Sequence, residues 1–362
     1  MVFSISKKKG EKRIVMAQVT VIVPIYNVEK YLRACFESLL QQTSDDFVVL
    51  AINDGSPDAS EEIIKEYVAK YPDKIYGIKK ENGGYGSVLQ VAFKELKTPY
   101  FLVCDPDDTL APNAVEKLLE LARLSNADLT IGAKTFVYDG KEEQDYDPAY
   151  NREFATLRVQ SVYNQGDDDF ADLFFVDPSP HAKLYRKSLV KDIQFPEKVG
   201  YTDNLLFYIS LLNSKKVIYT DESLANYLID RPGNTMTDVS YKALNGQILV
   251  FKTILAQAEK LNPIDMFYYR MFESFKYMLY QTRRLNCDEQ QYGEIMDYLE
   301  TFLQSLLPKG KIILPLYKKY TKNERIERLK DEALLTKATS HLMYQQMKKA
   351  MTKAFLEHKK EG

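Results

Sequence analysis

Short apolar segments alternate with amphipathic segments up to about residue 136 of the chain. Five runs rich in β-branched residues are typical of buried strands: Val19–Val23, Val48–Ile52, Ile75–Ile78, Phe101–Val103 and Leu129–Ile131. Four segments between them have the helical period: Glu29–Leu40, Glu61–Tyr71, Ser87–Leu96 and Asn113–Ser125. This alternation predicts an α/β fold, a Rossmann-like, mostly parallel sheet flanked by helices.

The alternation weakens after about residue 137, where the chain becomes acidic and rich in tyrosine. We expect irregular structure or edge strands there, followed by two strands at Val217–Thr220 and Leu224–Leu228. The predicted organisation is a disordered lead at residues 1–16, an α/β domain at 17–237 and an α-helical C-terminal region at 238–362.

The C-terminal region has helical periodicity, with breaks at Asn262-Pro263 and Leu307-Pro308. Its aromatic residues recur every three or four positions and form an apolar stripe. Such a stripe favours packing against the α/β domain or against a second subunit in a homodimer. Basic helices at Lys309–Lys322 and Lys348–Lys360 leave peripheral contact with a membrane as the alternative.

Composition excludes several classes of protein. Of the 362 residues, 45% are hydrophobic and 28% are charged, and the net charge of -2 disfavours bulk nucleic-acid binding, which needs an excess of Lys and Arg. Cys35, Cys104 and Cys287 have neither disulfide-framework nor zinc-site spacing. No signal peptide and no apolar run of membrane-spanning length is recognisable, so we expect a cytoplasmic protein.

Four of the predicted strands lead into loops that are rich in polar residues, proline and glycine. These loops are Pro24-Ile25-Tyr26-Asn27, Asn53-Asp54-Gly55-Ser56-Pro57-Asp58, Glu81-Asn82-Gly83-Gly84 and Asp105-Pro106-Asp107-Asp108. Because the carboxyl ends of parallel strands meet at one edge of a sheet, we expect the four loops to line one ligand site.

Asp105, Asp107 and Asp108 directly follow a buried strand. Carboxylates this close repel one another unless they are protonated or bridged by a cation. Oxygen ligands suit Mg²⁺ or Mn²⁺, which proteins bind through one or two carboxylates together with substrate phosphates. Such a cation would act as a Lewis acid on a departing diphosphate. The alternative is that these residues only turn the chain and cap the helix that begins near Pro112.

The other loops have residues that suit a nucleotide. Asp54 has the right chemistry to accept a hydrogen bond from a base imide N–H, and Tyr26 to stack on the base. Gly83 and Gly84 permit close approach of the backbone to a ligand. A simple turn at Asp54, a partly exposed Tyr26 and a tight glycine loop are the structural alternatives. The four loops in this order favour the functional interpretation.

This ordered set of loops resembles the family 2 glycosyltransferases, which are inverting enzymes with the GT-A fold. Val19–Asn27 resembles the opening strand of that family, and Asn53–Asp58 resembles its second-strand signature. Glu81–Gly84 and Asp105–Asp108 are similar to its next two landmarks, the second being its Asp-x-Asp metal motif. The resemblance spans roughly residues 17–232.

The resemblance implies a metal-dependent hexosyl- or N-acetylhexosaminyl-transferase with Mn²⁺ or Mg²⁺ as its cofactor. It would move a sugar from a nucleotide-sugar donor, usually UDP-linked, to a hydroxyl of a glycan, a glycolipid or a cell-surface polysaccharide precursor. The metal would bind Asp105, Asp107 and Asp108. The donor would contact Pro24, Tyr26, Asp54, Asn82, Gly83, Gly84, Asp105, Asp107, His181, Lys183 and Arg231.

Asp203 lies where that family has its acceptor-activating Asp, so we predict that it is the general base. A role as helix N-cap is the alternative. The chain departs from the family pattern at Val88-Leu89-Gln90, where Ala-Arg-Asn is common, and one positive contact to the nucleotide is therefore missing. Thr202 replaces the usual Glu, and His181-Ala182 replaces the common Trp/Cys-Asn, which changes the donor and acceptor pockets.

Two other functions are compatible with this composition. A nucleotidyltransferase also places metal-binding carboxylates on an α/β sheet, but it needs a Gly-rich phosphate loop with Lys or Arg after the first strand, and Tyr26–Glu29 is not one. An inactive sugar-nucleotide-binding module is the other alternative, and the intact Asp residues at positions 105, 107, 108 and 203 disfavour it.

Overall fold

The computed structural model describes residues 3–5, 14–229, 239–321 and 325–361. Contacts divide the chain into two compact units, Met1–Asn234 and Thr235–Gly362. Near the N-terminus, β1 (Phe3–Ile5) and β2 (Ile14–Met16) pair antiparallel, within the segment that we predicted to be a disordered lead.

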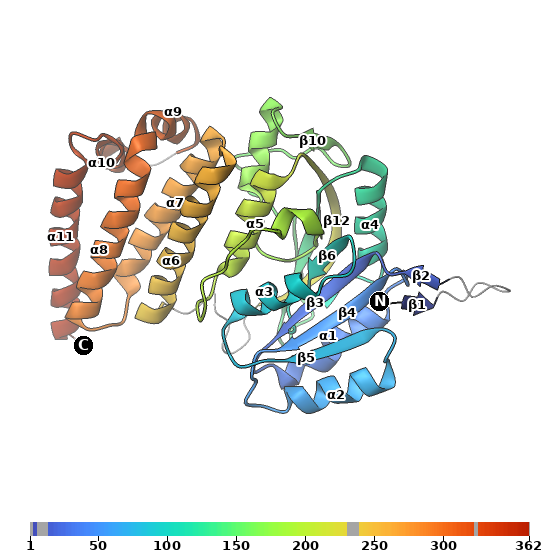
Figure 1. Ribbon diagram of the computed structural model, residues 1–362. Helices are drawn as coiled ribbons and strands as arrows, with labels where there is room; N and C mark the ends of the chain where they lie inside the picture. The colour runs from blue at the N-terminus through green and yellow to red at the C-terminus, as the bar shows by residue number, and fades with distance from the viewer. Residues whose placement is uncertain (1–2, 6–13, 230–238, 322–324, 362) are drawn as a thin grey trace. The chain divides into compact units, whose positions relative to one another are not determined.

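The first unit is built on a large mixed sheet whose N-terminal half is parallel (Figure 1). Its four strands are β3 (Val19–Ile25), β4 (Phe47–Asn53), β5 (Ile75–Lys79) and β6 (Tyr100–Val103). They lie in the order β6-β3-β4-β5, and each pairs in parallel with its neighbour. Every residue of β3, β4 and β6 is buried, which explains their unbroken apolar runs.

Helices cover the sheet as the alternating pattern predicts. The helices are α1 (Glu29–Leu40), α2 (Ser60–Lys70), α3 (Tyr85–Glu95), α4 (Ala114–Ser125) and α5 (Thr202–Asn213). Buried residues of α1, α2 and α4 join one apolar core with alternate residues of β3, β4 and β6. The remaining residues of these strands point to the opposite face, where α3 contacts β3 and β4 (Figure 1).

The C-terminal half of the sheet is mixed. Its strands are β7 (Thr109–Leu110), β8 (Leu129–Tyr138), β9 (Gln144–Asp147), β10 (Val162–Asn164), β11 (Lys183–Arg186) and β12 (Lys216–Ile229). β11 lies between β6 and β8 and is antiparallel to both, while β12 is parallel to β8. The two strands predicted between Val217 and Leu228 are one strand, β12, whose register shifts between Tyr219 and Ala225.

The second unit is helical, as predicted. Its helices are α6 (Tyr241–Ala258), α7 (Asp265–Gln281), α8 (Glu289–Leu306), α9 (Gly310–Tyr320), α10 (Arg325–Leu335) and α11 (Ser340–Glu361). Breaks at Asn262-Pro263 and Leu307-Pro308 are confirmed. Phe275 of the aromatic stripe in α7 packs inside this unit, against the rings of Phe302 and Tyr344, whereas Tyr277 and Tyr280 are exposed.

Candidate active site

The four predicted loops emerge together at the carboxyl edge of the parallel strands. Tyr26 follows β3, Asp54 follows β4, Lys80 follows β5 and Asp105 closely follows β6. The first two of these loops are joined by a hydrogen bond from Asp54 N to Ile25 O of 2.9 Å. Side chains that lie far apart in the sequence therefore meet at this edge.

Asp105, Asp108 and His181 form a group whose ligand atoms all lie within 4.8 Å of one another. The Asp-Pro-Asp-Asp segment is a turn closed by the bond from Asp108 N to Asp105 O of 3.0 Å, which brings its first and last carboxylates together. These residues do not cap α4, because its N-cap is Asn113. Of the predicted metal ligands, Asp105 and Asp108 belong to the group, whereas Asp107 does not, and His181 joins it from the residues that we assigned to the donor.

Asp108 and His181 are both buried, with only 3% and 6% of their side chains exposed. His181 Nε2 lies 2.6 Å from Asp108 Oδ2, and Asp108 Oδ1 accepts a hydrogen bond of 2.7 Å from Leu228 N in β12. His181 Nδ1 is buried without a hydrogen-bond partner in the described part of the chain.

Electrostatics also suit a cation at this group. Burial, together with the charge of Lys134, lowers the pKa of His181 to about 4, so the ring is neutral at pH 7 and can bind a metal. Burial and the neighbouring Asp108 raise the pKa of Asp105 to about 7. Two carboxylates and one neutral imidazole therefore fit a divalent cation.

Asp203 is the second residue of α5, whose N-cap is Tyr201. The alternative role of Asp203 as an N-cap therefore does not apply. Burial and the charge of Asp177 raise the pKa of Asp203 to about 6. The Tyr85 hydroxyl donates a 2.8 Å hydrogen bond to Asp105 Oδ1. Burial, Asp105 and then Asp203 raise the pKa of this phenol well above its usual value.

Asp54 is buried, with 3% of its side chain exposed, and its partners lie within the protein. Its carboxylate accepts hydrogen bonds from Lys80 Nζ, from Gly83 N at 3.0 Å and from Gly84 N at 2.8 Å. Asp54 therefore holds the glycine loop in place, which the sequence did not reveal.

The other predicted donor contacts lie in varied surroundings. Tyr26 is 49% exposed, as stacking on a base requires, whereas Pro24 is buried within β3. Asn82 is exposed. Arg231 lies outside the described residues.

Two buried lysines form a second charged group, and the sequence analysis named only Lys183. Lys183 Nζ donates a 2.6 Å hydrogen bond to Ser179 O, and burial lowers its pKa to about 7. Lys134, 1% exposed, donates to Asp177 and to Ser179 Oγ at 3.0 Å. Burial disfavours the ionised form of Asp177, yet Lys134 and Lys183 lower its pKa well below the usual range. The sequence feature that could have identified Lys134 is the presence of a lysine within the apolar run of β8.

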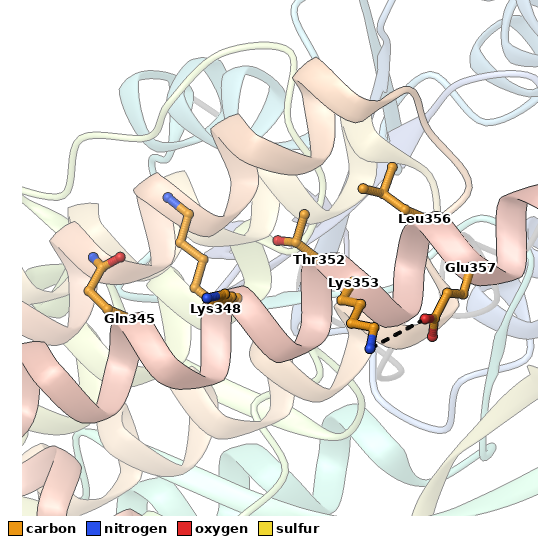
Figure 2. A pocket seen from close by; sticks show the side chains of 7 residues that line it. Gln345, Lys348, Thr352, Lys353, Leu356 and Glu357 are labelled. Carbon is orange, nitrogen blue, oxygen red and sulfur yellow. Dashed lines mark ion pairs between the residues drawn. The ribbon is translucent and has the colours of Figure 1, made fainter.

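The second unit has a groove that is lined mainly by lysine and other polar side chains. A hollow of about 600 Å³ lies along α11 and is lined by Gln345, Lys348, Lys349, Thr352, Lys353, Leu356 and Glu357 (Figure 2). Lys353 and Glu357 form an ion pair of 3.7 Å there, and Lys348 pairs with Asp297 of α8.

Within the ranges that the structure describes, no helix is both long enough and apolar enough to cross a membrane.

The fold and this acidic edge define a protein with the GT-A architecture. Residues 20–194 match the sequence model of glycosyl transferase family 2.

Among known proteins, this chain is similar to the minor teichoic acid biosynthesis protein GgaB of Bacillus subtilis, with 27% identity over 78% of this chain and 32% of GgaB. It is 25% identical to the poly(ribitol-phosphate) beta-glucosyltransferase of Bacillus spizizenii, over 82% of this chain and 47% of that protein. The chain thus spans 32% and 47% of the length of these two relatives. Its fold is similar to that of residues 1–349 of S. aureus TarS, solved in complex with UDP-GlcNAc, with a TM-score of 0.67, 20% identity, and 94% and 92% of the two chains covered.

Proposed function

We propose that this chain is a metal-dependent, inverting glycosyltransferase that takes a sugar from a UDP-linked donor. The observation that carries the proposal is the meeting of Asp105, Asp108 and His181 at the ligand edge of a family 2 domain. The donor set of two carboxylates and one imidazole within 4.8 Å of one another supports a bound cation.

Asp105, Asp108 and His181 would hold the divalent cation. When bound, such a cation offsets negative charge on the departing diphosphate. Tyr26 would stack on the base, and Asp54 would accept a hydrogen bond from it. The acidic ligands and a role for Asp107 remain predictions. The same holds for the donor contacts Asn82, Gly83, Gly84, Lys183 and Arg231. The domain limits at residues 17–237 also remain a prediction.

Asp203 would take the proton from the acceptor hydroxyl while that oxygen attacks the anomeric carbon and the bond from this carbon to the diphosphate breaks. The pKa of Asp203, about 6, leaves the carboxylate mostly ionised at pH 7 and more basic than an ordinary aspartate. The product has inverted configuration, since attack and departure occur on opposite faces.

The names of the relatives support an acceptor of the teichoic-acid type, a cell-surface polymer with free hydroxyls. The donor of the TarS complex supports an N-acetylhexosaminyl group, and the name of the glucosyltransferase supports a hexosyl group. Action in the cytoplasm or at the inner face of the membrane and homodimer formation stay predictions from the sequence.

Isothermal titration of the full chain with Mn²⁺ and then with UDP tests the proposal. We expect saturable Mn²⁺ binding, UDP binding that strengthens in Mn²⁺, and slow release of UDP from UDP-N-acetylglucosamine or UDP-glucose. His181→Ala should lose Mn²⁺ binding, while Asp139→Asn, which changes an exposed acidic residue, should keep it. Mn²⁺ binding that survives in His181→Ala would contradict the assignment of the metal site.

A further inference from the structure

Lys80 lies at the centre of a closed hydrogen-bond network in the loop that follows β5. Its ammonium group donates to Asp54 Oδ1, to Glu81 O at 2.6 Å and to Ser87 Oγ at 2.8 Å. An ammonium has three hydrogens, so these three acceptors use all of them. Only 19% of the Lys80 side chain is exposed. Lys80 therefore holds its neighbours in place and has no hydrogen left for a ligand.

The two glycines of this loop are needed for the network to close. A Cβ atom at Gly83 would lie 2.5 Å from Ser87 Oγ and 3.1 Å from Lys80 Nζ. Gly84 has a φ of +84°, and its carbonyl accepts a hydrogen bond of 2.8 Å from the Ser87 hydroxyl. The backbone N–H groups of both glycines point at Asp54 as a result.

The network determines which further hydrogen bond the Asp54 carboxylate can accept. A carboxylate has about four acceptor positions, two on each oxygen. Oδ1 accepts from Lys80 and Gly83, whereas among the described residues Oδ2 accepts only from Gly84. One acceptor position is left, on Oδ2.

Uracil and cytosine differ at the atom that faces such a group. N3 of uracil carries a hydrogen and donates it to an acceptor, whereas N3 of cytosine has a lone pair and needs a donor. We propose that Lys80 is a positioning residue that makes the nucleotide pocket selective for uracil over cytosine, by holding the Asp54 carboxylate so that Oδ2 keeps one open acceptor position. This inference rests on the proposed function, because it takes the base to lie against Asp54.

Competition between UDP and CDP for the full chain in Mn²⁺ tests the inference. We expect the wild type to bind UDP at least about tenfold more tightly than CDP, because cytosine leaves a buried acceptor facing a lone pair. Lys80→Met should bring the ratio of the two dissociation constants toward one, because the carboxylate loses the bond that fixes Oδ1 and no longer holds Oδ2 against N3 of uracil. Lys80→Arg keeps the charge and should restore the preference.

Two further variants make the test decisive. Lys79→Met removes the adjacent, exposed lysine and should leave the ratio unchanged. Asp54→Asn keeps the shape of the side chain and supplies an amide donor, so it should shift the ratio toward CDP even if Lys80→Met does not fold. An unchanged ratio in a folded Lys80→Met or in Asp54→Asn overturns the inference, as does a wild type without preference. A wild type that binds neither nucleotide overturns the proposed function as well.

Discussion

Replacing Asp203 by Asn should make the protein more stable and much less active at the same time. Burial and Asp177 raise the pKa of Asp203 from 3.8 to about 6, and this difference corresponds to at most about 3 kcal/mol against the ionised form. The asparagine side chain has nearly the same shape without the charge. We therefore expect Asp203→Asn to raise the free energy of unfolding at pH 7 by up to about 3 kcal/mol.

The sign of the pH dependence follows from the raised pKa. The folded state binds the proton more readily than the unfolded state, so ionised Asp203 destabilises the fold above about pH 6. This cost disappears as the pH falls through the folded pKa of about 6 toward 3.8, the value of an unperturbed aspartate. The gain from Asp203→Asn should therefore be full at pH 7 and absent below about pH 4.

The same substitution should lower the rate of UDP release from a UDP-sugar by about 10²- to 10⁴-fold, because a general base contributes this much. Donor affinity should hardly change. In the wild type the rate should fall as the pH drops below 6, and Asp203→Asn should lack this acid limb. Urea unfolding at several pH values and a continuous assay for UDP provide both readouts, with Asp192→Asn, at an exposed position, as the control. A stable variant with wild-type turnover would refute the assignment of the base, and a destabilised one would refute the electrostatic argument.

Three further outcomes are expected. Asp108→Ala should abolish Mn²⁺ binding in a calorimetric titration, because it removes one proposed ligand. Retained binding would point to another site. Gly84→Ala should lower the free energy of unfolding by about 1–3 kcal/mol more than Gly140→Ala. Both glycines have positive φ, but of the two only Gly84 would bring a Cβ atom against backbone, that of Lys198, at 3.1 Å. Equal urea midpoints of the two variants would exclude this contact as a cause. Tyr317→Phe should lower the free energy of unfolding by about 1–3 kcal/mol, because the buried hydroxyl donates a 2.6 Å hydrogen bond to Asp331. Tyr298→Phe, at a more exposed position, should change the free energy of unfolding little in the same urea titration.

The parallel half of the sheet and its four loops could be predicted because their information is local. Each strand is a buried apolar run followed by polar residues, and parallel strands bring those residues to one edge. Asp105 and Asp108 were recognised for this reason. Their turn places them in one group without Asp107, a distinction that depends on side-chain direction and that spacing along the chain does not give.

The mixed half could not be predicted in the same way. β11 pairs antiparallel with β6 and β8, which precede it by many residues, and no local pattern specifies such partners. His181 reaches the carboxylates because it lies just before β11, so its place in the group followed only from the topology. Lys134 was missed because a single lysine in an apolar strand usually lies at an exposed position, whereas here it is buried beside Asp177.

The hydrogen bond from Leu228 N to Asp108 has a consequence for synthesis of the chain on the ribosome. The carboxylate emerges early, yet the imidazole that it meets comes 73 residues later and its backbone partner 120 residues later. A nascent chain that has released only the parallel strands can begin to fold but cannot complete the group at their edge. The three side chains of the group are thus present together only after His181 has emerged, and the bond from Leu228 N can form only after β12 has emerged.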